Sequence, residues 1–251
     1  MNFEPLNLGM NKTYYAKKLN AERLRRVYEI AGPRVCQYLQ AEIDHLAGFV
    51  QPGDKILELG CGFGRVLAPL ARIAGQGWGV DNSPESVELA RAEYPDLNLS
   101  VMDAGSLDFD GHNFDLVFGV QNFISACKVP PEKLLRECLR VIRPGGRLLL
   151  SSYAEEFWPH RLKWFHRQAA EGLLGPIDEE ATGNGMIICT DGFKATTFSP
   201  REFWKLAASC GVSARVYTVD RSSVFCEISL FNAKAQRTQR VNYFWRINGK
   251  E

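Results

Sequence analysis

The 251-residue sequence predicts an α/β fold, a doubly wound and mostly parallel sheet of seven strands with helices on both faces. Three observations support this. Short apolar segments alternate with helical patterns from residue 55 to residue 152, and three spaced glycines follow the first apolar segment. The composition, 45% hydrophobic and 24% charged, is ordinary for a soluble globular domain. The length suits one large domain.

Residues 1–50 are expected to form an N-terminal helical lid. The segment "AERLRRVYEIA" (21–31) has the pattern of a short basic amphipathic helix, and Gly32 and Pro33 break it. A second helix follows with one apolar stripe, at Val35, Leu39, Ile43 and Leu46. Such a stripe predicts a helix that packs against something apolar.

Strands and helices then alternate. We expect parallel strands at 55–59, 77–81, 97–103, 114–120 and 147–152. Helices are expected at 65–74, from the capping pair Ser83 and Pro84 onward, and at 130–142, where Pro144, Gly145 and Gly146 end the last one. Helix 199–211 and a closing strand pair at 213–219 and 223–231 complete the sheet.

Residues 153–198 interrupt this alternation. They contain an aromatic-rich helix (155–174) and two β-like runs around Asp191 and Gly192, which mark a hairpin. An insertion after the fifth strand lies above the carboxyl ends of the strands, where open α/β sheets bind ligands, so we expect it to be a substrate cap. Residues 232–251 are predicted to be a polar, solvated extension, with a nucleic-acid anchoring arm as the alternative.

The glycine turn "ELGCGFG" carries the chemical signal. Glycines between a strand and a helix let the backbone approach a ligand closely and adopt positive φ. A nicotinamide dinucleotide would require G-x-G-x-x-G, but Arg65 stands where the third glycine of that pattern belongs. The spacing is instead Gly60, Gly62 and Gly64, preceded by Glu58.

This E-x-G-x-G-x-G pattern resembles the first motif of the class I S-adenosylmethionine (SAM)-dependent methyltransferases, which have a Rossmann-like fold. The resemblance extends over residues 51–152 and more loosely to the last helix and strand pair. Asp81 ends the second strand, 21 positions after Gly60, and "RVIRPGGRLLLSS" is similar to the family's Pro-Gly-Gly turn and fifth strand. The resemblance implies that residues 51–231 bind SAM and release S-adenosylhomocysteine (SAH).

The resemblance also implies roles for individual residues. Asp81 would hold the ribose hydroxyls, Glu58 the ammonium end, and Asp103 the adenine amino group. Asn82 stands where the family usually has an apolar residue, so adenine stacking would come from Phe63 or Leu107. The expected cofactor-binding residues are Glu58, Gly60, Cys61, Gly62, Gly64, Asp81, Asn82, Met102, Asp103, Ala104 and Gln121, together with Tyr14 and Tyr15, which resemble lid tyrosines.

The acceptor side is less defined by the sequence. Methyl transfer is an in-line displacement, and it needs a general base only when the acceptor must lose a proton. Four weak candidates for a base are Tyr153, His160, His166 and Asp191. The identity of the acceptor atom and the oligomeric state have no signal in the sequence.

Charge and cysteine content favour a small-molecule acceptor and a cytoplasmic location. The net charge of +1 gives no global attraction to nucleic acid or to a membrane, no apolar stretch is long enough to span one, and the seven cysteines have no metal-like spacing. Two alternatives remain open: a methyltransferase of RNA or protein, favoured by the basic first helix and tail, and a SAM-binding regulator without catalysis.

Overall fold

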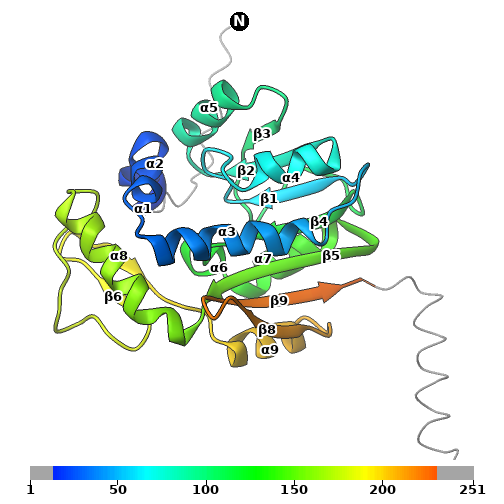
Figure 1. Ribbon diagram of the computed structural model, residues 1–251. Helices are drawn as coiled ribbons and strands as arrows, with labels where there is room; N and C mark the ends of the chain where they lie inside the picture. The colour runs from blue at the N-terminus through cyan, green and yellow to red at the C-terminus, as the bar shows by residue number, and fades with distance from the viewer. Residues whose placement is uncertain (1–13, 231–251) are drawn as a thin grey trace, which may run out of the picture.

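A computed structural model describes residues 14–230 of the chain (Figure 1). Seven strands form one sheet in the order β3-β2-β1-β4-β5-β9-β8. Strands β1 to β5 are mutually parallel, and β9 runs antiparallel to both β5 and β8. The strands are β1 (Ile56–Leu59), β2 (Gly77–Asp81), β3 (Asn98–Val101), β4 (Phe114–Gly119), β5 (Ile142–Tyr153), β8 (Arg215–Val219) and β9 (Ser223–Ser229). This sheet confirms the predicted fold class.

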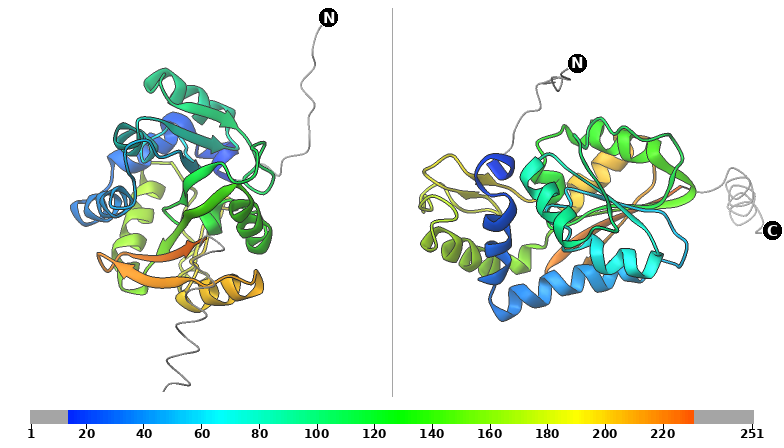
Figure 2. Two further views of the ribbon diagram at one scale, coloured as in Figure 1. Left: turned by 90° about the vertical axis from the view of Figure 1, so that its right-hand side faces the viewer. Right: turned by 90° about the horizontal axis from the view of Figure 1, so that it is seen from above.

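Helices cover both faces of the sheet, as the view from above in Figure 2 shows. One face packs against α3 (Pro33–Ala47), α4 (Leu67–Ala74) and α5 (Pro84–Glu93) through a cluster that includes Ile43, Leu46 and Leu70. The other face packs against short α6 (Phe123–Ala126), α7 (Pro131–Val141) and α9 (Pro200–Ser209). The C-terminal half of α3, a helix predicted as part of the lid, therefore packs as a layer of the sheet domain, while its N-terminal half packs against α8.

A third apolar cluster joins the N-terminal helices to the insertion. It contains residues of α1 (Tyr14–Lys18), α2 (Ala21–Glu29) and α3 together with residues of α8 (Trp158–Ala170), which a 3₁₀ turn, η1 (Glu155–Phe157), precedes. The predicted hairpin is present as β6 (Ile187–Ile188) and β7 (Lys194–Ala195). Helices α1, α2 and α8 and strand β6 lie together at one end of the molecule (Figure 1), and with β7 they are called the cap below.

Two boundaries differ from the sequence prediction. Helix α7 ends at Val141, and β5 begins at Ile142, so the Pro-Gly-Gly segment belongs to the strand. Strand pairing supports this early start, because Gly145 donates to the Leu230 carbonyl and Leu230 N donates to Gly146 O at 3.0 Å. The register between β4 and β5 shifts after Phe114 to accommodate it.

The predicted tail at 232–251 and the first 13 residues lie outside the described residues. Within residues 14–230, no helix combines the length and the apolar character that a membrane crossing requires.

Candidate functional site

A cavity of about 160 Å³ opens where the carboxyl ends of β1, β2 and β4 meet under the cap. Strand β1 is buried at all four positions and pairs with β2 on one side and β4 on the other, so its end is the centre of this edge. The lining comes from the glycine turn, the ends of β2, β3, β4 and β5, and helices α1, α2 and α8. Ligands bind at this edge of open α/β sheets.

The glycine turn forms the floor of the cavity. Gly60 and Gly62 have φ of +69° and +52°, a backbone conformation that residues other than glycine rarely adopt. A Cβ on Gly60 would also collide with the ring of Phe123. Gly60 N and Cys61 N donate to Val80 O at 2.8 and 3.0 Å, which ties the turn to β2.

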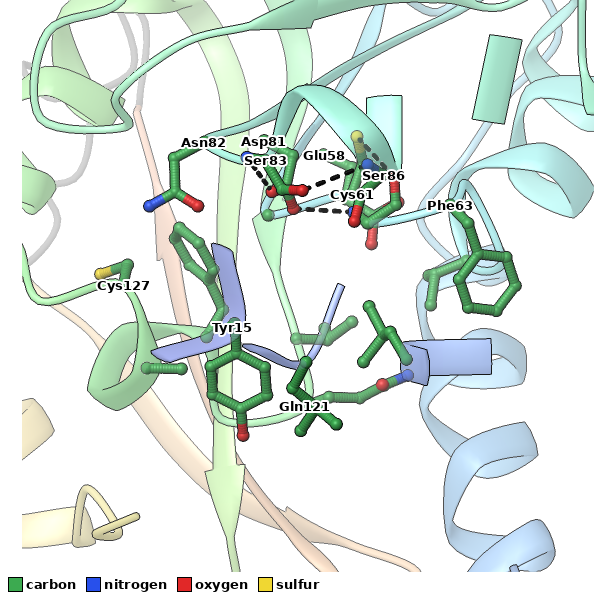
Figure 3. A pocket seen from close by; sticks show the side chains of 18 of the residues that line it. Tyr15, Glu58, Cys61, Phe63, Asp81, Asn82, Ser83, Ser86, Gln121 and Cys127 are labelled. Carbon is green, nitrogen blue, oxygen red and sulfur yellow. Dashed lines mark hydrogen bonds between the residues drawn. The ribbon is translucent and has the colours of Figure 1, made fainter. Parts of the chain in front are cut away.

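The Asp81 carboxylate faces the cavity from the end of β2 (Figure 3). Its Oδ2 accepts a hydrogen bond from Gly62 N and its Oδ1 accepts one from Ser83 N, both at 2.9 Å. Burial raises the pKa of Asp81 despite these two donors. Each oxygen keeps a lone pair for a ligand, so two adjacent hydroxyl groups have acceptors here.

The region next to Asp81 is lined by Asn82, Met102, Asp103 and Ala104, as the sequence predicted for a nucleobase. Asp103 Oδ1 accepts a hydrogen bond from Gly105 N at 2.7 Å, and that contact holds the loop after β3. Phe63 also lines the cavity, whereas Leu107 packs into the core. Figure 3 shows Phe63 on the other side of the cavity from Asn82, and its ring centre is 5.9 Å from that of Tyr28, so neither expected stacking residue lies in this region.

Three buried polar atoms of residues that line the cavity have no hydrogen-bond partner. They are Glu58 Oε2, Arg65 Nη2 and Gln121 Nε2, and all three residues line the same cavity. Buried polar groups are nearly always satisfied, so three orphans on one cavity indicate a polar ligand. One acceptor and two donors suit a group that carries both a positive and a negative charge.

The Gln121 side chain is positioned by an unusual turn. Gln121 and Asn122 have φ of +56° and +64°, two left-handed residues in succession at the end of β4. Gln121 N donates to Glu42 Oε2 at 3.1 Å and to Ser151 Oγ at 3.0 Å. Tyr28 Oη donates to Gln121 Oε1 at 2.8 Å, which fixes the amide orientation and leaves the amide nitrogen without a partner.

The cap closes the cavity with aromatic side chains. Tyr15 of α1, Tyr153 at the end of β5, and Trp164 and Phe165 of α8 line it together with Gln168. Trp164 Nε1 donates to Val27 O at 2.9 Å, which fixes α8 against α2. This end is mainly apolar, and its polar groups are the hydroxyls of Tyr15 and Tyr153 and the Gln168 amide.

The structure does not bring every predicted residue into the cavity. Gly64 and Tyr14 do not line it, although Gly64 has φ of +86° in the same turn. His160 and His166 are on the exposed side of α8, and Asp191 is on the surface of the hairpin. Tyr14 Oη donates to Asp191 Oδ2 at 2.5 Å, so these two residues connect α1 to the hairpin instead.

Sequence reasoning missed Arg65 and Tyr28 as site residues. Arg65 carries its guanidinium carbon 4.6 Å from the centre of the Tyr28 ring. Arg65 entered the sequence argument only as a residue that is not glycine, although its position directly after the glycine turn was a usable signal. Tyr28 had no signal, because α2 contacts the turn only through the tertiary fold.

Glu58→Gln is expected to stabilise the ligand-free protein, and more so as the pH rises. Burial raises the pKa of Glu58 well above its ordinary value, so the folded state keeps a proton that the unfolded state loses above about pH 4.3. The free energy of unfolding therefore falls as the pH rises toward the folded pKa, and glutamine removes this fall. The difference in melting temperature between the variant and the wild type, measured at pH 5 and at pH 8, tests this. Each kcal/mol of unfolding free energy should shift the melting temperature by roughly 2–4 °C. The control is exposed Glu88→Gln; equal shifts in both variants would contradict the assignment.

Comparison with known proteins agrees with this geometry. Residues 56–146 match the family model described as a methyltransferase domain. The demethylmenaquinone methyltransferase of Paenarthrobacter aurescens is 31% identical over 44% of this chain and 43% of its own length. The 2-methyl-6-phytyl-1,4-hydroquinone methyltransferase of Synechocystis is 31% identical over 63% of this chain and 58% of its own. The chain thus spans about half the length of the curated relatives it matches.

Solved structures share the fold. Magnesium protoporphyrin IX methyltransferase from Synechocystis, solved with bound SAH, has a TM-score of 0.59 and 19% identity, covering 86% of this chain and 96% of that one. Residues 56–146 are a methyltransferase domain, and the chain has the fold of the class I SAM-dependent methyltransferases.

Proposed function

We propose that this protein transfers a methyl group from SAM to a small-molecule acceptor. The observation that carries the proposal is the set of unpaired polar atoms on Glu58, Arg65 and Gln121, in the cavity that also contains the Asp81 carboxylate. SAM presents a ribose diol at one end and an amino acid with an ammonium and a carboxylate at the other. Figure 3 shows Asp81 and Gln121 across the cavity from each other.

The residues fit SAM group by group. Asp81 would accept hydrogen bonds from the ribose hydroxyls, and the Glu58 carboxylate would pair with the ammonium group. Arg65 and the Gln121 amide would donate to the carboxylate. Bare backbone at Gly60 and Gly62 leaves room for the ligand to lie against the turn.

When bound, SAM supplies an electrophilic methyl group on a sulfonium whose leaving group is a neutral sulfide. The chain then has to align the acceptor and exclude water, which together supply much of the rate in such displacements. Tyr15, Tyr153, Trp164 and Phe165 perform the second task, because they close the cavity on the side of the cap. No histidine among the described residues lines the cavity, so Tyr153 and Tyr15 are the titratable groups available at this end.

The small-molecule proposal is favoured over a nucleic-acid acceptor by the charges of α2. Arg23 donates to Gly172 O at 2.8 Å, Arg25 forms an ion pair with Glu93, and Arg26 pairs with Glu171 at 3.0 Å. These arginines join α2 to α5 and to the insertion. Acidic partners thus neutralise Arg25 and Arg26, and main-chain carbonyls hold the Arg23 guanidinium, which makes α2 a poorer site for a phosphate backbone.

Conversion of SAM to SAH in the presence of an acceptor panel tests the function. Quinols, phenols and aromatic carboxylates are suitable members, with SAH quantified by mass spectrometry. We expect acceptor-dependent SAH at low and at high salt. Binding of SAH without any turnover would favour the regulator alternative, steep loss of activity with salt on an RNA substrate would favour the nucleic-acid alternative, and failure to bind SAH would refute the proposal.

Arg65→Met is expected to weaken SAH binding about tenfold and to leave binding of 5′-methylthioadenosine unchanged. The second ligand keeps the nucleoside and lacks the amino acid, and a hydrogen bond to a charged group contributes about 1.5–3 kcal/mol. Calorimetry with both ligands measures the difference. The control is Arg72→Met, an exposed arginine on α4. Equal loss for both ligands would mean that Arg65 acts through the fold rather than on the carboxylate.

A further inference from the structure

Arg161 is a completely buried cation without an acidic partner. It lies in α8 with a relative exposure of 0%. Its Nη1 donates to Gly185 O at 2.7 Å, its Nη2 is 3.5 Å from Thr196 O, and its Nε has no acceptor. Among residues 14–230, no carboxylate forms an ion pair with it. Buried Glu227, in contrast, pairs with both Arg147 and Arg215.

This arrangement leaves one edge of the guanidinium almost free. Removing an ion from water costs several kcal/mol, and buried charges are normally paired. The rings of Tyr153, Trp158 and Phe165, with centres 4.4, 5.7 and 5.5 Å from the guanidinium carbon, offset part of that cost. Only Nη1 has a short hydrogen bond. The Nε–Nη2 edge, which binds planar oxyanions through two parallel hydrogen bonds, has one weak contact.

Arg161 lies directly behind the aromatic end of the cavity. Tyr153 and Phe165 contact the guanidinium and also line the cavity, beside Tyr15 and Gln168. The charged groups that line the cavity are Glu58, Arg65, Asp81 and Asp103, and all of them are on the sheet or the glycine turn. The positive charge of Arg161, which lies within the cap, is therefore separate from the residues assigned to SAM.

We infer that Arg161 binds an anionic oxygen group of the methyl acceptor, a carboxylate through two oxygens or a phenolate through its single oxygen, on an apolar or aromatic skeleton. The inference rests on the proposed function and adds the acceptor's chemical class to it. The aromatic wall contacts the skeleton. Arg161 is fully buried and does not itself line the cavity, so the Tyr153 side chain has to move aside for the oxyanion to reach the free edge. A neutral acceptor of the same shape leaves the buried positive charge of Arg161 uncompensated. The site therefore prefers a negatively charged acceptor.

The test compares charged and neutral probes of one shape on the full chain saturated with SAH. Benzoate and benzamide form one pair, and 4-nitrophenol at pH 8 and neutral 4-nitroaniline form the phenolate pair. We expect at least one anion to bind tenfold or more tightly than its neutral partner. Arg161→Met should abolish this preference, and Arg161→Lys should keep part of it. The matched control is Arg167→Met, an exposed arginine on the same helix, which should behave like the wild type.

The outcomes separate this inference from the proposed function. If SAH does not bind, the proposed function fails. If SAH binds but the wild type shows no preference for either anion, the inference is wrong, and this comparison needs no variant. A preference that persists in Arg161→Met would overturn it as well. If Arg161→Met does not fold, Arg161→Lys becomes the test. A reduced preference for the anion in this variant would support direct binding. A preference equal to that of the wild type, with the same pH dependence of anion binding, would count against it.

Discussion

Asp81→Ala should weaken SAH binding by about 30-fold, equivalent to roughly 2 kcal/mol. The Asp81 carboxylate offers the ribose two charge-assisted acceptors at the end of β2, and it also accepts from Gly62 N and Ser83 N. Alanine removes the acceptors for the ligand and leaves two backbone donors without their partner. Isothermal titration with SAH measures the effect, and 5′-methylthioadenosine should weaken by the same factor because it contains the same ribose.

Asp81→Asn separates the two contributions. Asparagine keeps one oxygen for the backbone donors, so we expect a smaller change in melting temperature than for alanine. It loses the negative charge, so we expect the affinity for SAH to fall by a comparable factor. An unchanged dissociation constant in both variants would contradict the ribose assignment. A loss for SAH alone would place Asp81 at the amino-acid end instead.

Glu42→Ala should lower the free energy of unfolding by about 3 kcal/mol, the size expected when one partner of a buried hydrogen-bond network is removed. Glu42 is completely buried in α3. Its Oε1 accepts from Ser151 Oγ at 2.6 Å and from Ser223 Oγ at 2.8 Å, and its Oε2 accepts from Gln121 N. Alanine would leave these donors in a cavity, lowering the melting temperature by roughly 6–12 °C.

Glu42→Gln gives a different result, because it keeps the volume. Its amide oxygen can still accept from the two serines, but its amide nitrogen would face the Gln121 N–H, donor against donor. We expect a smaller loss of stability than for alanine, with SAH binding weakened and 5′-methylthioadenosine binding preserved. This selectivity would identify Glu42 as a positioning residue for Gln121. Equal weakening of both ligands would mean that Glu42 only supports the fold.

Asn122 supports the same turn from the other side. Its Nδ2 donates to Thr196 O at 2.8 Å and its Oδ1 accepts from Ser152 Oγ at 2.7 Å. Consecutive serines of β5 thus point to opposite faces, Ser151 toward Glu42 and Ser152 toward Asn122. Two left-handed residues cost of order 1–3 kcal/mol each, and these contacts on both sides hold them in place. The turn is therefore connected both to α3 and to the insertion.

The sheet and the half of the cavity next to Asp81 were predictable because their signals are local. The apolar strands, the glycine spacing and Asp81 each occupy a fixed place relative to a strand end, and parallel pairing brings the strand ends together. Predicted residues such as Asn82, Met102 and Ala104 line the cavity for this reason. The insertion and its hairpin were also predictable, since Asp191 and Gly192 mark the turn between β6 and β7.

The cap side was less predictable, because its residues come from distant segments. His160 and His166 were reasonable candidates from their residue type, yet the orientation of α8 places both outside and buries Arg161 instead. Glu42 lies on the apolar face of its helix, where the hydrophobic pattern gives no reason to expect a buried carboxylate. Its role depends on Ser151 and Ser223, which are 109 and 181 positions away.

The sequence by itself determined the fold class, the glycine turn and the carboxylate at position 81, because each depends on backbone conformation or on the period of a strand or helix. Only the tertiary structure decided which polar atoms lack partners, which arginine is buried without an acid, and which helix belongs to the sheet rather than to the lid. Those properties depend on what packs against each side chain, because burial in a low-dielectric interior makes an unpaired charge costly.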